Sequence, residues 1–200
     1  PDTYIAALSA KIREMGVEVL ENDPVEEFLQ EDGKVKGVRA RQAGELRADA
    51  TVCTLNAWAN SLMTGVGQPI PAHNYVHERF MSAPFAEVPD MPATNDNAGQ
   101  IYYRPTEDNR ILFGTGAHEP VRHTMPGIDF DYSQLELDPQ PEPFIRNAIR
   151  ERLPIMEGVE LEQHRIGLIS MTADTMPNIG PVGALPGLYL GCNFNSGGFG

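Results

Sequence analysis

The sequence predicts an α/β (α+β) fold in which helices and sheets pack in two layers. Two stretches, residues 3–15 and 141–153, carry apolar residues at helical spacing. Short apolar runs bounded by turn residues lie between them, as is typical of strands. The chain ends with a strand that enters a glycine-rich loop over 193–200. The order of these segments indicates that the first and last parts of the chain share one domain.

The N-terminal third is expected to hold one helix and several strands. Ile5, Leu8, Ile12 and Met15 recur at helical spacing, and Gly16 follows as a stop signal. Asp32-Gly33 between two apolar runs is typical of a hairpin turn. We therefore predict strands over 17–20, 25–30 and 35–41, a buried strand over 50–55, and a helical turn over 56–60.

A stiff connector from Gly67 to Pro71 marks an expected domain boundary. After it the sequence predicts a strand over 75–83, a surface loop over 84–98 and a hairpin of 100–104 with 110–114. A long loop is expected over 117–139. The second helix runs from Pro141 to Leu153, where Pro154 ends it, and 159–168 is extended again.

The last thirty residues form the most distinctive segment. An apolar strand is predicted from Leu185 to Cys192, and in the loop that follows only Phe194 and Phe199 are bulky. A loop of small residues lets backbone N–H groups approach a flat or anionic ligand closely. A plain glycine-rich turn is the alternative interpretation. Because the chain stops at Gly200 inside this pattern, we expect it to be a piece of a longer protein.

Composition excludes several classes of partner. The net charge of -13 argues against nucleic acid and anionic membrane surfaces, which require basic patches. No apolar run is long enough for a membrane span, and the opening residues lack the basic start of a secretory signal. Cys53 and Cys192 have no metal-ligand spacing, and no metal site is expected. We interpret both as buried thiols of a cytoplasmic protein, with a disulfide as the alternative.

Four stretches, in this order, carry a family resemblance: 17–38, 48–58, 101–114 and 171–200. The last contains Thr-x-Asp-x-x-Pro-x-Ile-Gly from Thr172 to Gly180. Together they resemble the D-amino-acid oxidase superfamily of FAD-dependent oxidoreductases, which includes glycine oxidase, the sarcosine oxidases and dehydrogenases, and dimethylglycine dehydrogenase. The run from Asn195 to Gly198 favours the sarcosine and dimethylglycine branch.

The resemblance implies an enzyme that oxidises the C–N bond of a small amino acid or N-methyl amine by hydride transfer to FAD. It also implies a split FAD-binding domain in residues 1–66 and 166–200, and a substrate-binding domain with a mixed sheet in 67–165. The family's opening βαβ unit with its G-x-G-x-x-G turn is not found in this sequence. The choice between oxidase and dehydrogenase, and the oligomeric state, stay open.

The resemblance also implies cofactor-binding residues. Val25 would contact the adenine through its backbone, and Asn56 and Ala57 would lie near the FAD. Asn56 and Asn193 both stand where the family usually has Gly. The flavin pyrimidine edge would face a run of four residues, Asn195, Ser196, Gly197 and Gly198. Hydrogen-bond donors at that edge stabilise the negative charge of reduced flavin.

Substrate-binding residues are the least specified part of the resemblance. The family's carboxylate-binding Arg would stand at position 169 or 170, where this sequence has Ile169 and Ser170. Either another cation such as Arg104 or Arg165 binds the carboxylate instead, or the substrate lacks that contact. His77 is the candidate general base, and Tyr102 is a candidate for closing the pocket over the amine. For each Arg the alternative is an ordinary ion pair. For the chain as a whole, the alternative to an enzyme is a non-catalytic homologue or a small-ligand binding module.

Overall fold

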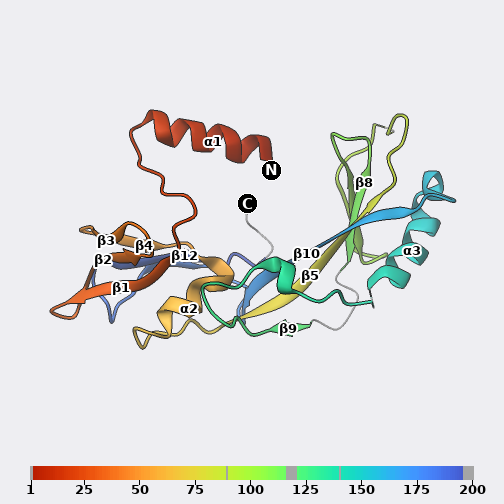
Figure 1. The fold of residues 1–200 in the computed structure, drawn as a ribbon. Coiled ribbons are helices and arrows are strands. Elements are labelled where there is room, and N and C mark those ends of the chain that lie inside the picture. The colour runs from red at the N-terminus through yellow and green to blue at the C-terminus, as the bar shows by residue number, and fades with distance from the viewer. Residues whose placement is uncertain (1, 89, 116–120, 140, 196–200) are drawn as a thin grey trace.

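The fold is seen in a computed structural model that describes residues 2–88, 90–115, 121–139 and 141–195. In these residues the strands form three sheets, and the chain is a mixed α/β protein as predicted. Figure 1 shows the two smaller sheets at one end of the molecule and the end of the large sheet with helix α3 at the other. The long strands β5 (Ala72–Ser82) and β10 (Leu161–Thr172) run between these two ends.

The N-terminal helix α1 (Asp2–Glu14) confirms the predicted helix. Gly16 adopts a left-handed backbone with φ of 84° and ends it. The predicted strand over 17–20 is wrong, because this exposed segment pairs with no strand of the described chain. An apolar alternation becomes a strand only where a neighbouring strand and a covered face are available.

The first sheet, β1-β2-β3, is an antiparallel meander of β1 (Val25–Glu31), β2 (Lys34–Ala40) and β3 (Gly44–Arg47). Asp32 and Gly33 both have positive φ, 50° and 72°, which is the type I′ turn that matches strand twist. The hairpin prediction is therefore confirmed.

The second sheet, β11-β12-β4, contains the one parallel pair among the described strands. Here β12 (Leu188–Cys192) runs antiparallel to β11 (Asn178–Pro181) and parallel to β4 (Thr51–Cys53). The strand predicted over 50–55 is shorter than expected and only partly buried, with Val52 60% exposed. The predicted helical turn is present as η1 (Asn56–Trp58) and α2 (Ala59–Met63).

These two sheets and α2 enclose the first core. Gly187 permits their close approach, because a Cβ there would lie 2.3 Å from the Val35 carbonyl oxygen. The Val35 N–H donates to the Pro186 carbonyl at 2.9 Å. The core is formed by buried side chains from the two sheets, from α2 and from the segments that connect them: Phe28, Val35, Cys53, Ala59, Leu62, Met63, Ile70, Leu185, Leu188 and Cys192. Both cysteines are free buried thiols, as expected.

The third sheet has the order β10-β5-β8-β7-β6, with β9 (Arg122–His123) also paired to β5. It contains the predicted hairpin as β7 (Ile101–Pro105) and β8 (Ile111–Thr115), and a short strand β6 (Thr94–Asp96) inside the predicted loop. Every pair in it is antiparallel, so the mixed sheet expected in 67–165 is a wrong prediction. The short β7–β8 connection can join only antiparallel neighbours.

Helix α3 (Pro141–Arg152) covers one face of this sheet, followed by the short helix η3 (Pro154–Met156). The second core forms between them from Phe80, Ile111, Phe113, Ile145, Ile149, Leu153 and Met156. The predicted long loop holds β9 and η2 (Tyr132–Gln134) in the part that the structure describes. Buried Glu78 fixes the end of this loop: its carboxylate accepts from the Asp138 N–H at 2.5 Å and lies 2.8 Å from His164 Nε2.

Among the described helices none has the length and apolarity to cross a membrane.

Candidate functional site

One row of side chains crosses the large sheet on the face opposite α3. The strand registers place Arg165 opposite Arg79, Arg79 opposite Gly114, Gly114 opposite Tyr102, and Tyr102 opposite Asn95. Directly opposite residues of antiparallel strands point to the same face. The row therefore runs from a cationic end on β10 and β5, across a glycine on β8, to a phenol and an amide on β7 and β6. We call it the arginine–tyrosine row.

The central contact of the row is between His77 and Tyr102. His77 Nε2 lies 2.7 Å from the Tyr102 hydroxyl, and the two rings stack with centroids 6.1 Å apart. Burial raises the pKa of Tyr102, and the charges of Arg79 and Arg104 lower it in part. The phenol is therefore protonated at neutral pH, and it donates to Nε2 in the tautomer whose proton is on Nδ1. The structure thus joins two residues predicted separately from the sequence.

Gly114 makes this contact possible. The Tyr102 ring lies over the strand β8, and a Cβ at position 114 would stand 2.0 Å from its hydroxyl oxygen. Any side chain at this position would push the phenol away from its present place. The absence of a side chain on β8 lets Tyr102, on β7, reach across to His77 on β5.

Arg104, the third residue predicted for the substrate site, follows Tyr102 by two positions on β7 and shares its face. Its Nη1 donates to the Pro105 carbonyl at 3.2 Å, and its charge acts on the Tyr102 hydroxyl. Arg165 lies on the same face through its pairing with Arg79. Arg79, which follows His77 by two residues on β5, was not predicted from the sequence.

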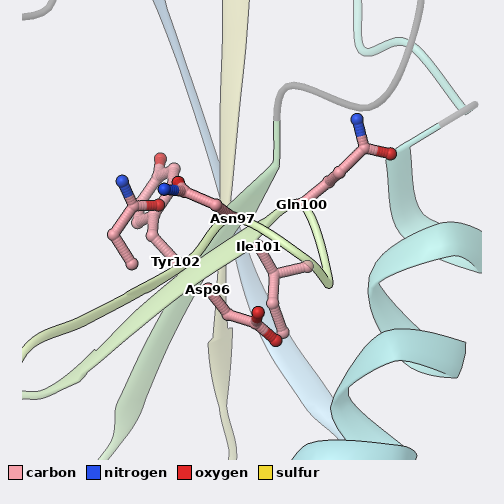
Figure 2. A pocket seen from close by; sticks show the side chains of 6 residues that line it. Asp96, Asn97, Gln100, Ile101 and Tyr102 are labelled. Carbon is pink, nitrogen blue, oxygen red and sulfur yellow. The ribbon is translucent and has the colours of Figure 1, made fainter.

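A hollow of about 280 Å³ opens at the β6–β7 end of the row. Its wall includes Tyr102 and three amide side chains, those of Asn95, Asn97 and Gln100. Figure 2 shows Tyr102 and Asn97 on one side of this hairpin and Asp96 pointing to the other side, where the helix lies. The N–H of Gly99 and the guanidinium of Arg152 both bind the Asp96 carboxylate and lower its pKa.

A second cluster lies where the neighbouring strands β4 and β12 end. Asn56, Asn193 and Asn195 all have left-handed backbone, with φ of 46°, 58° and 55°. Asn56 Oδ1 accepts from the Asn193 N–H at 3.0 Å, and Asn195 Nδ2 donates to the Asn193 carbonyl at 3.2 Å. The Asn193 side chain is buried and donates to Ser170 Oγ at 2.6 Å. We call this set the asparagine cluster.

Those predicted cofactor residues that the structure describes lie at two places. Asn56 and Asn195 belong to the asparagine cluster, and Ala57 follows directly, with its carbonyl accepting from Asn74 Nδ2 at 2.9 Å. Val25 begins β1, opposite Ala40, and packs against the first core. Ser196, Gly197 and Gly198 lie outside the described residues. Ser170, one of the two positions where the family's carboxylate-binding Arg would stand, is buried against Asn193.

The cluster fits one edge of a dinucleotide site. Its residues follow the carboxyl ends of a parallel strand pair, which is where ligands bind in open α/β sheets. Two adjacent turns carry three residues with left-handed backbone here, Asn56, Asn193 and Asn195. The structure shows no gathering of three or more His, Cys, Asp or Glu side chains that could hold a metal within the described ranges.

A family model described as FAD dependent oxidoreductase (DAO) matches residues 1–200. The chain belongs to this family. Within it, the human mitochondrial sarcosine dehydrogenase is 27% identical over 202 residues, which cover 98% of this chain and 21% of the relative. The glycine oxidase of Pseudomonas putida is 28% identical over 176 residues, 88% of this chain and 44% of the relative.

Among solved structures, the L-proline dehydrogenase from P. horikoshii superposes on this DAO-family chain with a TM-score of 0.81 at 23% identity. The match covers 95% of this chain and 49% of that one. The chain therefore spans less than half the length of these relatives. The likeness establishes the fold of this part of the family.

Proposed function

We propose that this chain forms the substrate-binding part, and some of the cofactor-binding part, of an FAD-dependent oxidoreductase that oxidises the C–N bond of a small amino acid or N-methyl amine. The observation that carries the proposal is the 2.7 Å contact between His77 and Tyr102 on an arginine-bearing sheet face. Family membership supports the cofactor, and relatives named for glycine and sarcosine support the substrate class.

In this proposal His77 acts as the general base. An amine substrate arrives as an ammonium ion and must lose a proton before its nitrogen lone pair can assist C–H cleavage. When the Tyr102 hydroxyl turns its own proton toward the substrate carboxylate, the lone pair of the unprotonated Nε2 becomes free to accept the proton of the ammonium ion. FAD, when bound, supplies the hydride acceptor. Water then hydrolyses the imine product.

Arg104 binds the substrate carboxylate in this arrangement. Its charge reaches the Tyr102 hydroxyl, so a carboxylate placed between them would receive a charge-assisted hydrogen bond from the guanidinium. Tyr102 closes the same site from the β7 side. Ser170, one of the two positions where the family's Arg would stand, carries a short buried side chain, so this proposal assigns the carboxylate contact to another strand.

For the cofactor we propose contacts from Val25, Asn56, Ala57 and the loop Asn195–Gly198. The division into a split FAD-binding domain (1–66 and 166–200) and a substrate-binding domain (67–165) belongs to the same proposal. The pairing of β4 with β12 supports it, since this pair joins the first and last of these segments.

The test is anaerobic flavin reduction by the FAD-loaded full-length protein with sarcosine and glycine. We expect His77→Gln to slow reduction by about 10²- to 10⁴-fold, the usual contribution of a general base. Tyr102→Phe should slow it less, since it removes only the partner of the base. His73→Gln, an exposed histidine of the same strand, is the matched control and should leave the rate unchanged. Wild-type rates in His77→Gln, or no reduction by any small amine, would favour a non-catalytic homologue.

A further inference from the structure

The turn Asn56–Trp58, which forms η1, is held by three segments that lie far from it in the sequence. Two of its residues are proposed above as cofactor contacts, so we call it the cofactor turn. Asn56 Oδ1 accepts from the N–H of Asn193, where β12 ends, at 3.0 Å. The carbonyl of the buried Ala57 accepts from Nδ2 of Asn74, on β5, at 2.9 Å. The first contact thus comes from the proposed cofactor edge, and the second comes from the large sheet.

The third contact comes from the segment between β9 and α3. Trp58 Nε1 donates to the Phe130 carbonyl at 3.3 Å, and the Trp58 ring packs on Tyr132 with centroids 5.2 Å apart. Phe130 is only 7% exposed and lies against His123 of β9, with ring centroids 4.6 Å apart. Since β9 pairs with β5, this aromatic cluster connects the cofactor turn to the same strand that carries Asn74.

Asn74 lies at a point of β5 that is held from both sides. It is opposite Ser170 of β10 and opposite His123 of β9, and a strand paired on two sides opens only together with its sheet. His77 follows three residues later, about 10 Å along the strand. Because three is an odd number of steps, the two side chains point to opposite faces. Asn74 therefore acts on the site of His77 through the strand itself.

Hydride transfer needs the substrate and the cofactor at a fixed separation. The proposed base lies on β5, whereas the proposed cofactor contacts lie on the cofactor turn and beyond β12. A misplacement of about 1 Å between reacting groups can cost a rate factor of about 100. The bond from Asn74 to the Ala57 carbonyl joins these two parts directly. The alternative is a purely structural role, since buried carbonyls need donors in any fold.

We infer that Asn74 is a positioning residue, which holds the cofactor turn at the distance from β5 that hydride transfer requires. The contact of Trp58 with Phe130 braces the same joint from the loop. The inference rests on the proposed function, since it needs FAD at the cofactor turn and the amine beside His77. It assigns an effect on the chemical step to a side chain on the sheet face opposite that of the proposed base.

The experiment replaces Asn74 in the FAD-loaded full-length protein and measures binding and rate separately. We expect Asn74→Ala to slow flavin reduction at saturating sarcosine by about 10- to 100-fold. The dissociation constants of FAD and sarcosine should stay within about threefold of the wild type, because Asn74 contacts neither ligand in this proposal. The visible circular dichroism of the bound oxidised flavin, which needs no turnover, should change as the ring shifts against its surroundings.

Ser82→Ala is the matched control on the same strand. The buried Ser82 Oγ accepts from the Ile111 N–H at 2.9 Å, so this variant also removes one hydrogen bond between a side chain and a backbone group. Ser82 lies five residues beyond His77 and makes its bond to β8, away from the cofactor turn. Both variants should lower the midpoint of urea unfolding, whereas Ser82→Ala should leave the reduction rate within about twofold and the flavin spectrum unchanged.

Three results would overturn the inference and leave C–N oxidation intact. A wild-type rate in Asn74→Ala, with a lowered urea midpoint, would reduce this side chain to a structural role. Equal slowing by Ser82→Ala would indicate a general loosening of the sheet. A loss of FAD affinity of more than tenfold at an unchanged rate would mean that Asn74 holds the cofactor and does not position it. Failure of both sarcosine and glycine to reduce the wild-type flavin would instead refute the proposed function, and with it the role assigned to Asn74.

Discussion

Gly114→Ala is the substitution that tests the geometry of the arginine–tyrosine row most directly. The added Cβ would stand 2.0 Å from the Tyr102 hydroxyl oxygen and 2.1 Å from the ring carbon that carries it. Ordinary contact begins at 3.4 Å, so the hydroxyl must move by about 1.4 Å. Gly114 does not have the left-handed backbone that only glycine adopts freely, so alanine adds no backbone strain. The whole effect therefore comes from the displaced phenol.

The expected cost has two parts. The present bond of 2.7 Å to His77 Nε2 would be stretched beyond hydrogen-bond range, a loss of about 0.5–1.5 kcal/mol. Crowding a half-buried ring adds about 1 kcal/mol, the lower end of the overpacking range, because the tyrosine can swing toward solvent. We expect Gly114→Ala to lower the free energy of unfolding by about 1–3 kcal/mol.

Urea unfolding of five proteins checks this value: the wild type, Gly114→Ala, Gly167→Ala, Tyr102→Ala and the double variant of positions 102 and 114. Gly167→Ala is the matched control, since Gly167 lies opposite His77 on β10 and a Cβ there meets no atom within 4 Å. It should be neutral or stabilising by about 0.4–1 kcal/mol. In the Tyr102→Ala background Gly114→Ala should cost nothing further, so the double-mutant cycle should show a coupling of about 1 kcal/mol or more. Equal stability of Gly114→Ala and Gly167→Ala, with no coupling to position 102, would refute the reasoning.

Three further outcomes are expected. Asn193→Ala should destabilise the protein by about 2–4 kcal/mol in urea unfolding, because a buried amide network loses its centre, and Asn193→Gly should cost about 1 kcal/mol less since it keeps the left-handed backbone. The Gly99 N–H depresses the pKa of Asp96 in the folded protein. The ionised carboxylate therefore stabilises the fold above its unfolded pKa of about 4, and this stability is lost as the pH falls through the lower folded pKa. The free energies of unfolding at pH 7 and at pH 3 should consequently differ less in Asp96→Asn than in the wild type. Burial raises the pKa of Cys192 to about 11, so the unfolded thiol ionises first and stability should fall as the pH rises from about 8.5 toward 11. Burial also raises the pKa of Cys53, so the loss should be smaller in Cys192→Ala than in the wild type but not absent.

The elements that the sequence predicts well depend on neighbours within a few residues. Both long helices, the Asp32-Gly33 turn and the β7–β8 hairpin are of this kind, and all are present. The segment 17–20 has an equally good apolar alternation and forms no strand, because a strand also needs a partner that the local sequence does not encode. The same limit explains the predicted mixed sheet, since strand direction is a property of pairs.

The arginine–tyrosine row shows what information was missing. His77, Tyr102 and Arg104 could be selected from a resemblance and from their chemistry. Arg79 could not be preferred over the other arginines until the registers of four strand pairs were known, because only they place it in line with Gly114 and Tyr102. A shift of one residue in any pair would move a side chain to the α3 face. The role of Gly114 could not be predicted from the sequence for the same reason, because it depends on the Tyr102 ring that reaches across Gly114 from the neighbouring strand β7.

The asparagines at the two positions where the family resemblance implies glycine show how a change of residue can keep the same backbone conformation. Asn56 and Asn193 both adopt the left-handed conformation that glycine usually supplies, and asparagine is the residue that tolerates it best after glycine. The substitution therefore preserves the path of both turns. It also adds two amides, one accepting from the other residue's N–H and one reaching Ser170. With glycine at both positions, fewer hydrogen bonds would join these turns. The unfolded chain would also have more conformational freedom at both positions. The exchange thus makes the edge where β4 and β12 end more rigid, and that rigidity would favour the cofactor contacts proposed there.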